Sequence, residues 1–388
     1  RKRGKIDMAK KLVSVWLSLT ILLFSSISIY ADENVQGDFF IKNIVINGET
    51  IDNNHLQFPF FLYKDTTYFP LTPEMSEILG LKAEMDLESR TLKLLKKEPS
   101  LSNISDCRKK NEREDVLTQV FSDVKVYAYE IDRHSLEEIV EDGESADTTE
   151  DIQNPEGTID DVVIAFPELI VKEIDLTELP VLTKENIIYL PLRAMTGEGG
   201  FGWSVYYDPF TGIYVSTNAD VPAESYWNEA ESKYNRGLVN YIRSYNASHT
   251  ENKAQELVFL FKNAAKTYGI DEKILMAVAH RESTFNPRSG ANGGAVGIMQ
   301  VMPSTGARYG LSVEQLLDAE TSINFGAMYL SERITAYGGD LTKGFSAYNQ
   351  GSVKVNRGTY STRYANRVIS TIDNINSYLT SNGYGLGY

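Results

Sequence analysis

The sequence is poor in residues that build covalent or metal-bound frameworks. It has one cysteine, Cys107, and four scattered histidines among 388 residues. One thiol cannot form an intramolecular disulfide, and a structural zinc site needs several Cys or His ligands at suitable spacing. We therefore expect no disulfide, no metal site and no bound cofactor.

Proline, glycine and positive charge are also limited. The 12 prolines and 28 glycines, with 42% hydrophobic residues, exclude a collagen-like repeat and wholesale disorder. The 38 Lys and Arg against 53 Asp and Glu give a net charge of −15. This balance argues against nucleic acid as a partner, because phosphate binding needs a cationic surface. The length allows two or three domains.

A long apolar run occurs near the beginning of the sequence. Residues 1–11 contain six Lys or Arg, and residues 12–30 that follow are apolar or uncharged, up to Ala31. This order is typical of a secretory signal that is cut after Ala31. The run is also long enough to span a bilayer, so an uncleaved anchor at residues 1–31 is the alternative. Either way we expect a secreted or cell-surface protein, with membrane contact only through this segment.

A strand pattern occurs twice in the acidic part of the chain. Pro70 and Pro191 each end a run of β-branched and aromatic residues, and Asp86 and Asp208 each follow an alternating run. The prolines are 121 residues apart and the aspartates 122. Each copy predicts a strand that enters the proline, one or two helical turns, and two strands around a turn.

This pattern resembles the copper amine oxidase-like N-terminal domain. The resemblance implies a β-rich domain over residues 38–218, built from two half-repeats and interrupted here by an acidic insert at 97–163. Residues 137–161 are so acidic that we expect a mobile loop. We expect no copper, because neither copy has a histidine cluster. Residues 219–252 predict an amphipathic connecting helix.

Residues 253–388 have a helical pattern and 13 basic against 10 acidic residues, so this part could approach an anionic polymer. Glu282 lies on the same predicted helix face as Leu275 and Val278. Partial burial would raise the pKa of this carboxyl, as a general acid requires. The alternative is an exposed glutamate paired with Arg281 or Arg288.

Four motifs lie in and after this helix: 280–287, 294–305, 323–330 and 345–351. They resemble the soluble lytic transglycosylase (SLT) domain, of the glycoside hydrolase family 23 type, over residues 253–388. The resemblance implies an all-α, lysozyme-like fold of the goose type. The predicted fold class of the chain is therefore multidomain α+β.

The resemblance also implies roles for individual residues. Glu282 matches the catalytic acid, and the positions matching substrate-binding residues are Ser283, Met299, Gln300, Tyr348, Asn349 and Tyr364. For the Met299 side chain, packing in the core is an equal alternative. The implied reaction cleaves the β-1,4 bond between N-acetylmuramic acid and N-acetylglucosamine in peptidoglycan glycan strands. Glu282 acts as acid and then as base, and 1,6-anhydromuramic ends form.

Two other functions are open at this point. A hydrolytic muramidase would need a second carboxylate, and none lies between Glu282 and Gln300. Acidic residues elsewhere could fold into the site: Glu314, Asp318, Glu320, Glu332 and Asp340. The second alternative is a surface protein that binds the cell wall without cutting it.

Overall fold

The computed structural model describes residues 33–40, 42–53, 56–100, 116–121, 123–132, 169–176, 178–290 and 294–385. The predicted signal or anchor, the loop at 137–161 and part of the proposed insert lie outside these ranges. No helix in the described ranges is long and apolar enough to cross a bilayer.

The chain folds into two compact units that alternate along the sequence. The first takes its described residues from 1–40, 53–204 and 217–219. The second takes them from 41–52, 205–216 and 220–388. Two short segments of the predicted N-terminal domain therefore fold with the C-terminal helices.

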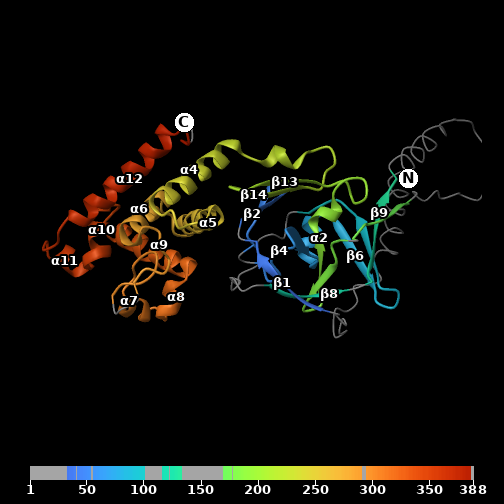
Figure 1. Ribbon diagram of the computed structural model, residues 1–388, viewed down its shortest axis with the longest axis horizontal. Helices are drawn as coiled ribbons and strands as arrows, with labels where there is room; N and C mark the ends of the chain where they lie inside the picture. The colour runs from blue at the N-terminus through green and yellow to red at the C-terminus, as the bar shows by residue number, and fades with distance from the viewer. Residues whose placement is uncertain are drawn as a thin grey trace, which may run out of the picture. The chain divides into compact units, whose positions relative to one another are not determined.

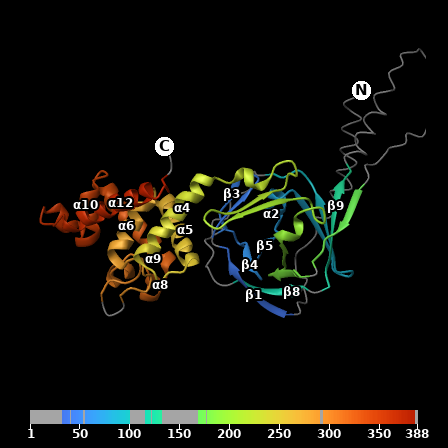
Figure 2. The same ribbon diagram turned by 45° about the horizontal axis from the view of Figure 1, so that its top comes forward.

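A closed barrel of six antiparallel strands forms the centre of the first unit (Figure 2). Its strands, in order around the barrel, are β1 (Glu33–Phe39), β4 (Phe61–Tyr63), β5 (Thr66–Pro70), β12 (Ile187–Pro191), β11 (Val181–Lys184) and β8 (Val116–Phe121). Phe61, Tyr68, Leu182 and Tyr189 are buried together. The rings of Phe61 and Tyr68 stack with centroids 5.6 Å apart. Closure of the barrel leaves these strands without an open edge.

A four-stranded sheet completes the β structure of the first unit. Its order is β10 (Leu169–Glu173), β9 (Lys125–Ile131), β7 (Thr91–Lys96) and β6 (Leu81–Asp86). Strands β8 and β9 fall within residues 97–163, so part of the segment interpreted as an insert belongs to the barrel and the sheet. The alternation in β9 is short and lies next to a strongly acidic stretch, which hides it in the sequence.

The two predicted strand patterns have the same order of elements. In the first, β5 leads to helix α2 (Pro73–Ile78) and the hairpin β6–β7. In the second, β12 leads to the 3₁₀ helix η2 (Leu192–Met195) and the hairpin β13–β14. The Oδ1 atoms of Asp86 and Asp208 accept bonds from backbone N–H groups of their hairpin turns, at 3.0 and 2.9 Å. Duplication itself stays a prediction.

A second four-stranded sheet belongs to the second unit. Its order is β13 (Ser204–Asp208), β14 (Gly212–Ser216), β2 (Asn43–Ile46) and β3 (Glu49–Ile51), with β14 and β2 parallel. A Cβ at Gly212 would lie 2.1 Å from the Asn43 carbonyl oxygen, so only glycine allows this approach. The hairpin turn binds the next helix, where Asn235 Nδ2 donates to the Phe210 carbonyl at 2.8 Å.

The remaining elements of the second unit are helical (Figure 1). They are η3 (Ala223–Tyr226), α4 (Glu229–Tyr245), α5 (Glu251–Tyr268), α6 (Glu272–Ser283), α7 (Pro303–Ala307), α8 (Val313–Leu317), α9 (Ala319–Ala336), α10 (Leu341–Gln350), α11 (Ser352–Asn356) and α12 (Arg363–Ser381). Side chains of Asn228, Thr250 and Asp340 accept N-terminal backbone bonds and start α4, α5 and α10.

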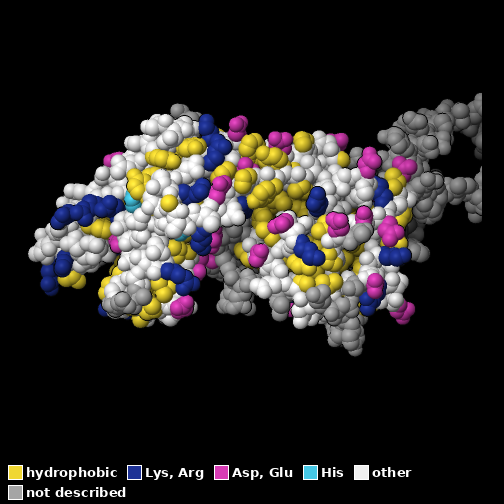
Figure 3. Space-filling model, viewed as in Figure 1, with side chains coloured by type: hydrophobic (Ala, Val, Ile, Leu, Met, Phe, Trp, Pro, Cys, Tyr) yellow, Lys and Arg dark blue, Asp and Glu magenta, His cyan; other side chains and the backbone are white. Residues whose placement is uncertain are grey.

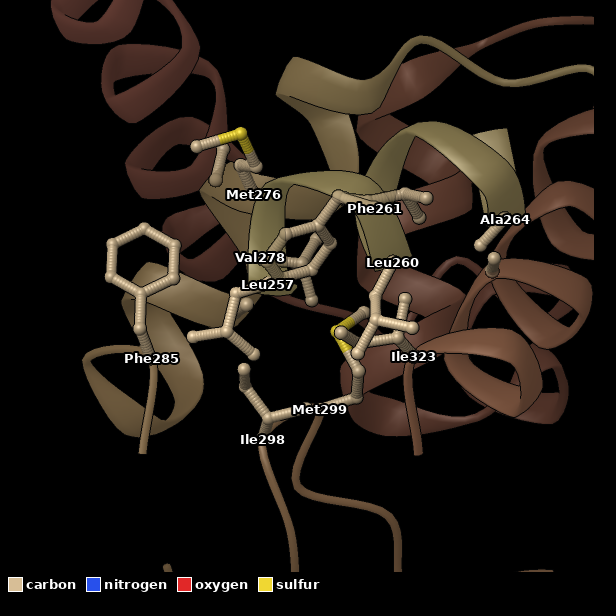
Figure 4. Close-up of a cluster of buried hydrophobic side chains, with 14 of the residues drawn as sticks. Leu257, Leu260, Phe261, Ala264, Met276, Val278, Phe285, Ile298, Met299 and Ile323 are labelled. Carbon is tan, nitrogen blue, oxygen red and sulfur yellow. The ribbon is translucent and has the colours of Figure 1, made fainter. Parts of the chain in front are cut away.

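One apolar core joins these helices. Figure 4 shows Leu257 and Phe261 of α5 near Val278 of α6, with Ile323 of α9 in the same cluster. Helix α4, predicted as a connection, buries Leu238 and neighbouring side chains in this core. The close packing fixes α6, which carries the predicted catalytic residue.

Candidate active site

Helix α6 places Glu282 in its last turn, at the edge of the core. The helix starts at Asp271, whose side chain accepts a bond from the Lys273 N–H at 2.7 Å. Leu275 and Val278 are fully buried, and Glu282 is partly buried. The helical spacing predicted this position one and two turns beyond the apolar residues.

A tyrosine from a distant helix binds the Glu282 carboxyl. Tyr364, near the start of α12, donates its hydroxyl to Glu282 Oε1 over 2.5 Å. Burial raises the pKa of Glu282, while the Tyr364 bond and the charge of Arg281 lower it by less. Burial also raises the pKa of Tyr364 well above its usual value, so the hydroxyl keeps its proton. Among the described residues Glu282 forms no ion pair, with Arg281 and Arg288 included.

The chain turns sharply directly after the carboxyl. Thr284 and Phe285 are both left-handed, with φ of 52° and 61°. The Asn246 side chain donates to the Thr284 carbonyl at 2.9 Å, and His249 Nε2 donates to the Phe285 carbonyl at 2.8 Å. Non-glycine residues adopt this backbone only when their surroundings hold it, and such positions cluster at functional sites.

Ser283 joins α6 to the loop that follows. Its hydroxyl contacts the Ile298 carbonyl at 2.8 Å and the Ala279 carbonyl at 3.1 Å. Both partners are acceptors, so the Ser283 hydroxyl is the donor in both contacts. The geometry gives Ser283 a positioning role; its predicted contact with substrate stays a prediction.

Met299 presents its backbone to the site and its side chain to the core. The side chain is fully buried, and its Cε would lie 2.8 Å from a Cβ at Gly326. Figure 4 shows it beside Leu260 and Ile323. The Met299 carbonyl accepts the Tyr348 hydroxyl bond at 2.8 Å. The sequence left open whether the Met299 side chain contacts substrate or packs in the core, and in the structure it packs in the core.

Gln300 closes the loop before it. Its backbone is left-handed, with φ of 47°. Its Nε2 donates to the carbonyls of Ser289 at 3.1 Å and Gly297 at 2.9 Å. The amide nitrogen is thus used within the loop, and the predicted contact of Gln300 with substrate stays a prediction.

Helix α10 supplies the second tyrosine beside Glu282. Burial raises the pKa of Tyr348, and the negative charge of Glu282 raises it further. The Tyr348 ring meets the Tyr329 ring edge-on at 5.8 Å. Asn349, the next residue, is exposed. Sequence reasoning assigned no role to Tyr329, although it lies in one of the four motifs.

Three of the other candidate carboxyls have structural partners. Asp318 and Asp340 accept backbone bonds at the starts of α9 and α10, at 2.8 and 3.0 Å. Glu332 pairs with Arg333 at 2.8 Å. No carboxylate is among the groups that shift the pKa of Glu282. In the described part of the chain, no three His, Cys, Asp or Glu side chains gather as a metal site would need.

This arrangement is a partly buried carboxyl with a raised pKa, beside two tyrosines, on a helical scaffold. Residues 259–368 match the family model described as "Transglycosylase SLT domain". These residues form an SLT domain. The match covers α6, α7 to α11 and the Glu282–Tyr364 pair.

Two curated relatives are similar to part of the chain. The membrane-bound lytic murein transglycosylase C of Haemophilus influenzae (strain PittEE) is 32% identical in an alignment of 127 residues, and the match covers 29% of this chain and 36% of the relative. The transglycosylase of Enterobacteria phage PRD1 is 33% identical over 110 residues, 28% of this chain and 40% of the relative. This chain thus covers little more than a third of each.

Two solved structures also match. The inactive mutant of lytic transglycosylase Slt from Pseudomonas aeruginosa is 21% identical, with a TM-score of 0.29, over 40% of this chain and 31% of that one. The 70 kDa soluble lytic transglycosylase from Escherichia coli is 24% identical, with a TM-score of 0.26, over 42% and 34%.

Proposed function

We propose that the SLT domain is a peptidoglycan lytic transglycosylase. It cleaves the β-1,4 bond between N-acetylmuramic acid and N-acetylglucosamine. The observation that carries this proposal is the Glu282 carboxyl, whose pKa is raised by burial and which Tyr364 holds by a short hydrogen bond. The names of the curated relatives support the same reaction.

Glu282 acts first as an acid. Its proton passes to the glycosidic oxygen as the bond from that oxygen to C1 of the muramic acid breaks. The carboxylate then takes the proton of the muramic 6-hydroxyl while this oxygen bonds to C1. A 1,6-anhydro ring closes, no water is consumed, and Glu282 ends protonated. Tyr364 holds the carboxyl in one orientation through both steps.

A single carboxyl suits this sequence of steps better than hydrolysis. Hydrolysis by two carboxylates requires the second one within about 5–10 Å of the first. Asp318, Glu332 and Asp340 are engaged with helix ends or an arginine. An internal hydroxyl as acceptor removes the need for a carboxylate that activates water.

The cellular setting follows from the same proposal. The substrate lies outside the cytoplasmic membrane, so residues 1–31 would serve as an export signal or anchor. For the β-rich part we propose a copper amine oxidase-like domain of two half-repeats, supported by the matching order of elements around β5 and β12. Its ligand is not part of the proposal.

The test uses the full chain on purified sacculi, beside Glu282→Gln and the exposed control Glu224→Gln. Mass spectrometry of the released muropeptides should show products one water lighter than hydrolysed ones, from wild type and Glu224→Gln. Glu282→Gln should release about 10²–10⁴-fold less and still bind sacculi. Reducing-end products would identify a hydrolase instead. Binding without release by wild type would identify a wall-binding protein.

A further inference from the structure

A basic surface lies over α11 and the start of α12. Residues 341–372 contain five basic residues and no acidic one, in a chain whose net charge is −15. Figure 3 shows Lys and Arg side chains gathered over the end of the unit where α11 and the start of α12 lie. Composition alone indicated that residues 253–388 could approach an anionic polymer. The four cations of the basic surface are Lys354, Arg357, Arg363 and Arg367.

These cations form two adjacent pairs. Lys354 lies in α11, and Arg357 is the capping residue at which that helix ends. Arg363 and Arg367 are four positions apart in α12. Side chains three or four positions apart lie on the same side of a helix, with Cβ atoms about 5–6 Å apart. All four are exposed, and none forms an ion pair with another described residue.

Hydrogen bonds hold the backbone under the two pairs. Gln350, the last residue of α10, donates from Nε2 to the Ser361 carbonyl at 2.7 Å and accepts from the Ser361 N–H at 3.0 Å. Tyr337 donates its hydroxyl to Asn356 Oδ1 at 2.9 Å. Helix α10 also packs against both α11 and α12. A ligand therefore meets cations on an ordered loop and does not have to order the loop itself.

The arrangement of the charges favours a flexible chain with repeated negative groups. A single small anion reaches one pair, whereas a polyanion reaches both pairs and releases counterions at each contact. Lysine binds phosphate as a point charge and arginine binds it through its N–H fork, so the mixed pair on α11 suits phosphodiesters. Docking on a bilayer needs a buried apolar face. On α11 the exposed large apolar side chain is Val353.

We propose that the basic surface of α11 and α12 binds an anionic polymer of the cell envelope whose charges are phosphodiesters. Such a polymer holds the protein at the wall through contacts other than those of the cleaved glycan. The proposal goes beyond the cleavage reaction. Only the choice of an envelope polymer over nucleic acid rests on the proposed function, which places the chain outside the cytoplasmic membrane.

The experiment measures binding of the full chain to labelled, soluble poly(glycerol phosphate) by fluorescence anisotropy. Lys354→Gln with Arg357→Gln should raise Kd about 10- to 30-fold and make the dependence of log Kd on log salt shallower by about 1, because two phosphate contacts are lost. The control, Lys266→Gln with Arg308→Gln, removes one exposed lysine from α5 and one exposed arginine from the end of α7. The control should bind like wild type.

A second variant separates charge from shape. Lys354→Arg with Arg357→Lys keeps both charges and should keep the wild-type Kd and salt dependence. Because both side chains are exposed, all variants should unfold at the wild-type Tm. Loss of binding in this exchange variant, equal to that of the glutamine pair, would show that charge is not what the polymer recognises and would overturn the proposal.

Four other results would also overturn it. Wild type could fail to bind the polymer at low salt, or the control pair could lose as much affinity as the α11 pair, which indicates general attraction. Polyglutamate of the same length could bind as tightly, so phosphate would not be the recognised group. Phosphatidylglycerol vesicles could bind more tightly and depend on the same pair, which identifies a membrane surface. None of these measurements involves cleavage, so they stand even if sacculi are not cut and the proposed function fails.

Discussion

The hydroxyl of Tyr364 donates to Oε1 of Glu282 across 82 positions of sequence, and this bond joins the start of α12 to the end of α6. It favours the ionised carboxyl, whereas burial favours the protonated one. Burial has the larger effect, so the pKa stays raised. The bond thus restrains the orientation of a carboxyl whose pKa is raised by burial.

Tyr364→Phe should change the pH dependence of activity in a defined direction. Loss of the bond raises the pKa of Glu282 further, so the acid form survives to higher pH. The alkaline limb of the kcat/KM profile should move to higher pH, and kcat at the optimum should fall about tenfold because the carboxyl is less well oriented. Tyr378→Phe, on the same helix, is the control. An alkaline limb that stays in place or moves to lower pH would contradict this assignment.

Glu282→Gln should make the protein more stable at high pH. A carboxyl whose pKa is raised by folding contributes fully below its unfolded pKa, about 4.3, and its contribution is lost as pH rises through the folded value. Thermal unfolding at pH 8 should therefore show a higher Tm for Glu282→Gln than for wild type, and at pH 3 no difference. The same change at exposed Glu314 controls for the loss of a charge. A Tm gain of equal size at both pH values would show that burial of the charge is not the cause.

Thr284→Gly should stabilise the turn that follows the carboxyl. A β-branched residue is strained at a φ of 52°, and glycine is not. We expect the free energy of unfolding to rise by about 0.5–1 kcal/mol, measured by urea denaturation. Thr284→Ala keeps the Cβ and should show no such gain. If Thr284→Gly and Thr284→Ala change the free energy of unfolding equally, the left-handed backbone of Thr284 is not the source of the strain.

Gly326→Ala should destabilise the protein through Met299. The new Cβ would lie 2.8 Å from Cγ and Cε of Met299, which is too close for carbon atoms. We expect a loss of about 1–3 kcal/mol in urea denaturation. Activity should fall as well, because the Met299 carbonyl holds Tyr348. In combination with Met299→Ala the loss should be smaller than the sum of the single losses. If the losses of the two single variants simply add in the double variant, the new Cβ does not act through its contact with Met299.

Local patterns in the sequence predicted much of this structure. The apolar spacing around Leu275 and Val278 predicted that Glu282 lies on the buried face of α6, and its burial confirms this. The alternating runs before Asp86 and Asp208 predicted hairpins, and both are present. These features depend on neighbours within a few residues, where periodicity is informative.

Contacts between residues far apart in the sequence could not be predicted from such local patterns. Strand β2 pairs with β14, so that Asn43 lies opposite Gly212, and neither strand's pattern names its partner. Met299 does not lie in a periodic pattern of apolar residues. The sequence therefore could not show whether its side chain packs in the core or lies at the surface. Arg281 of α6 and Arg363 and Arg367 of α12 line one pocket only because these two helices pack together, although the spacing of Arg363 and Arg367 already places those two on one helix face.

The alternation of the two units along the chain has a consequence for proteolysis. A single cut near residue 219 would separate the backbone of the helices from that of the sheet β13–β14–β2–β3. The two pieces would still be joined by Lys42 to Gln255 at 3.0 Å, Ser232 to Asp208 at 2.9 Å and Asn235 to Phe210 at 2.8 Å. A nicked protein should therefore migrate as two bands in denaturing gels and elute as one particle under native conditions.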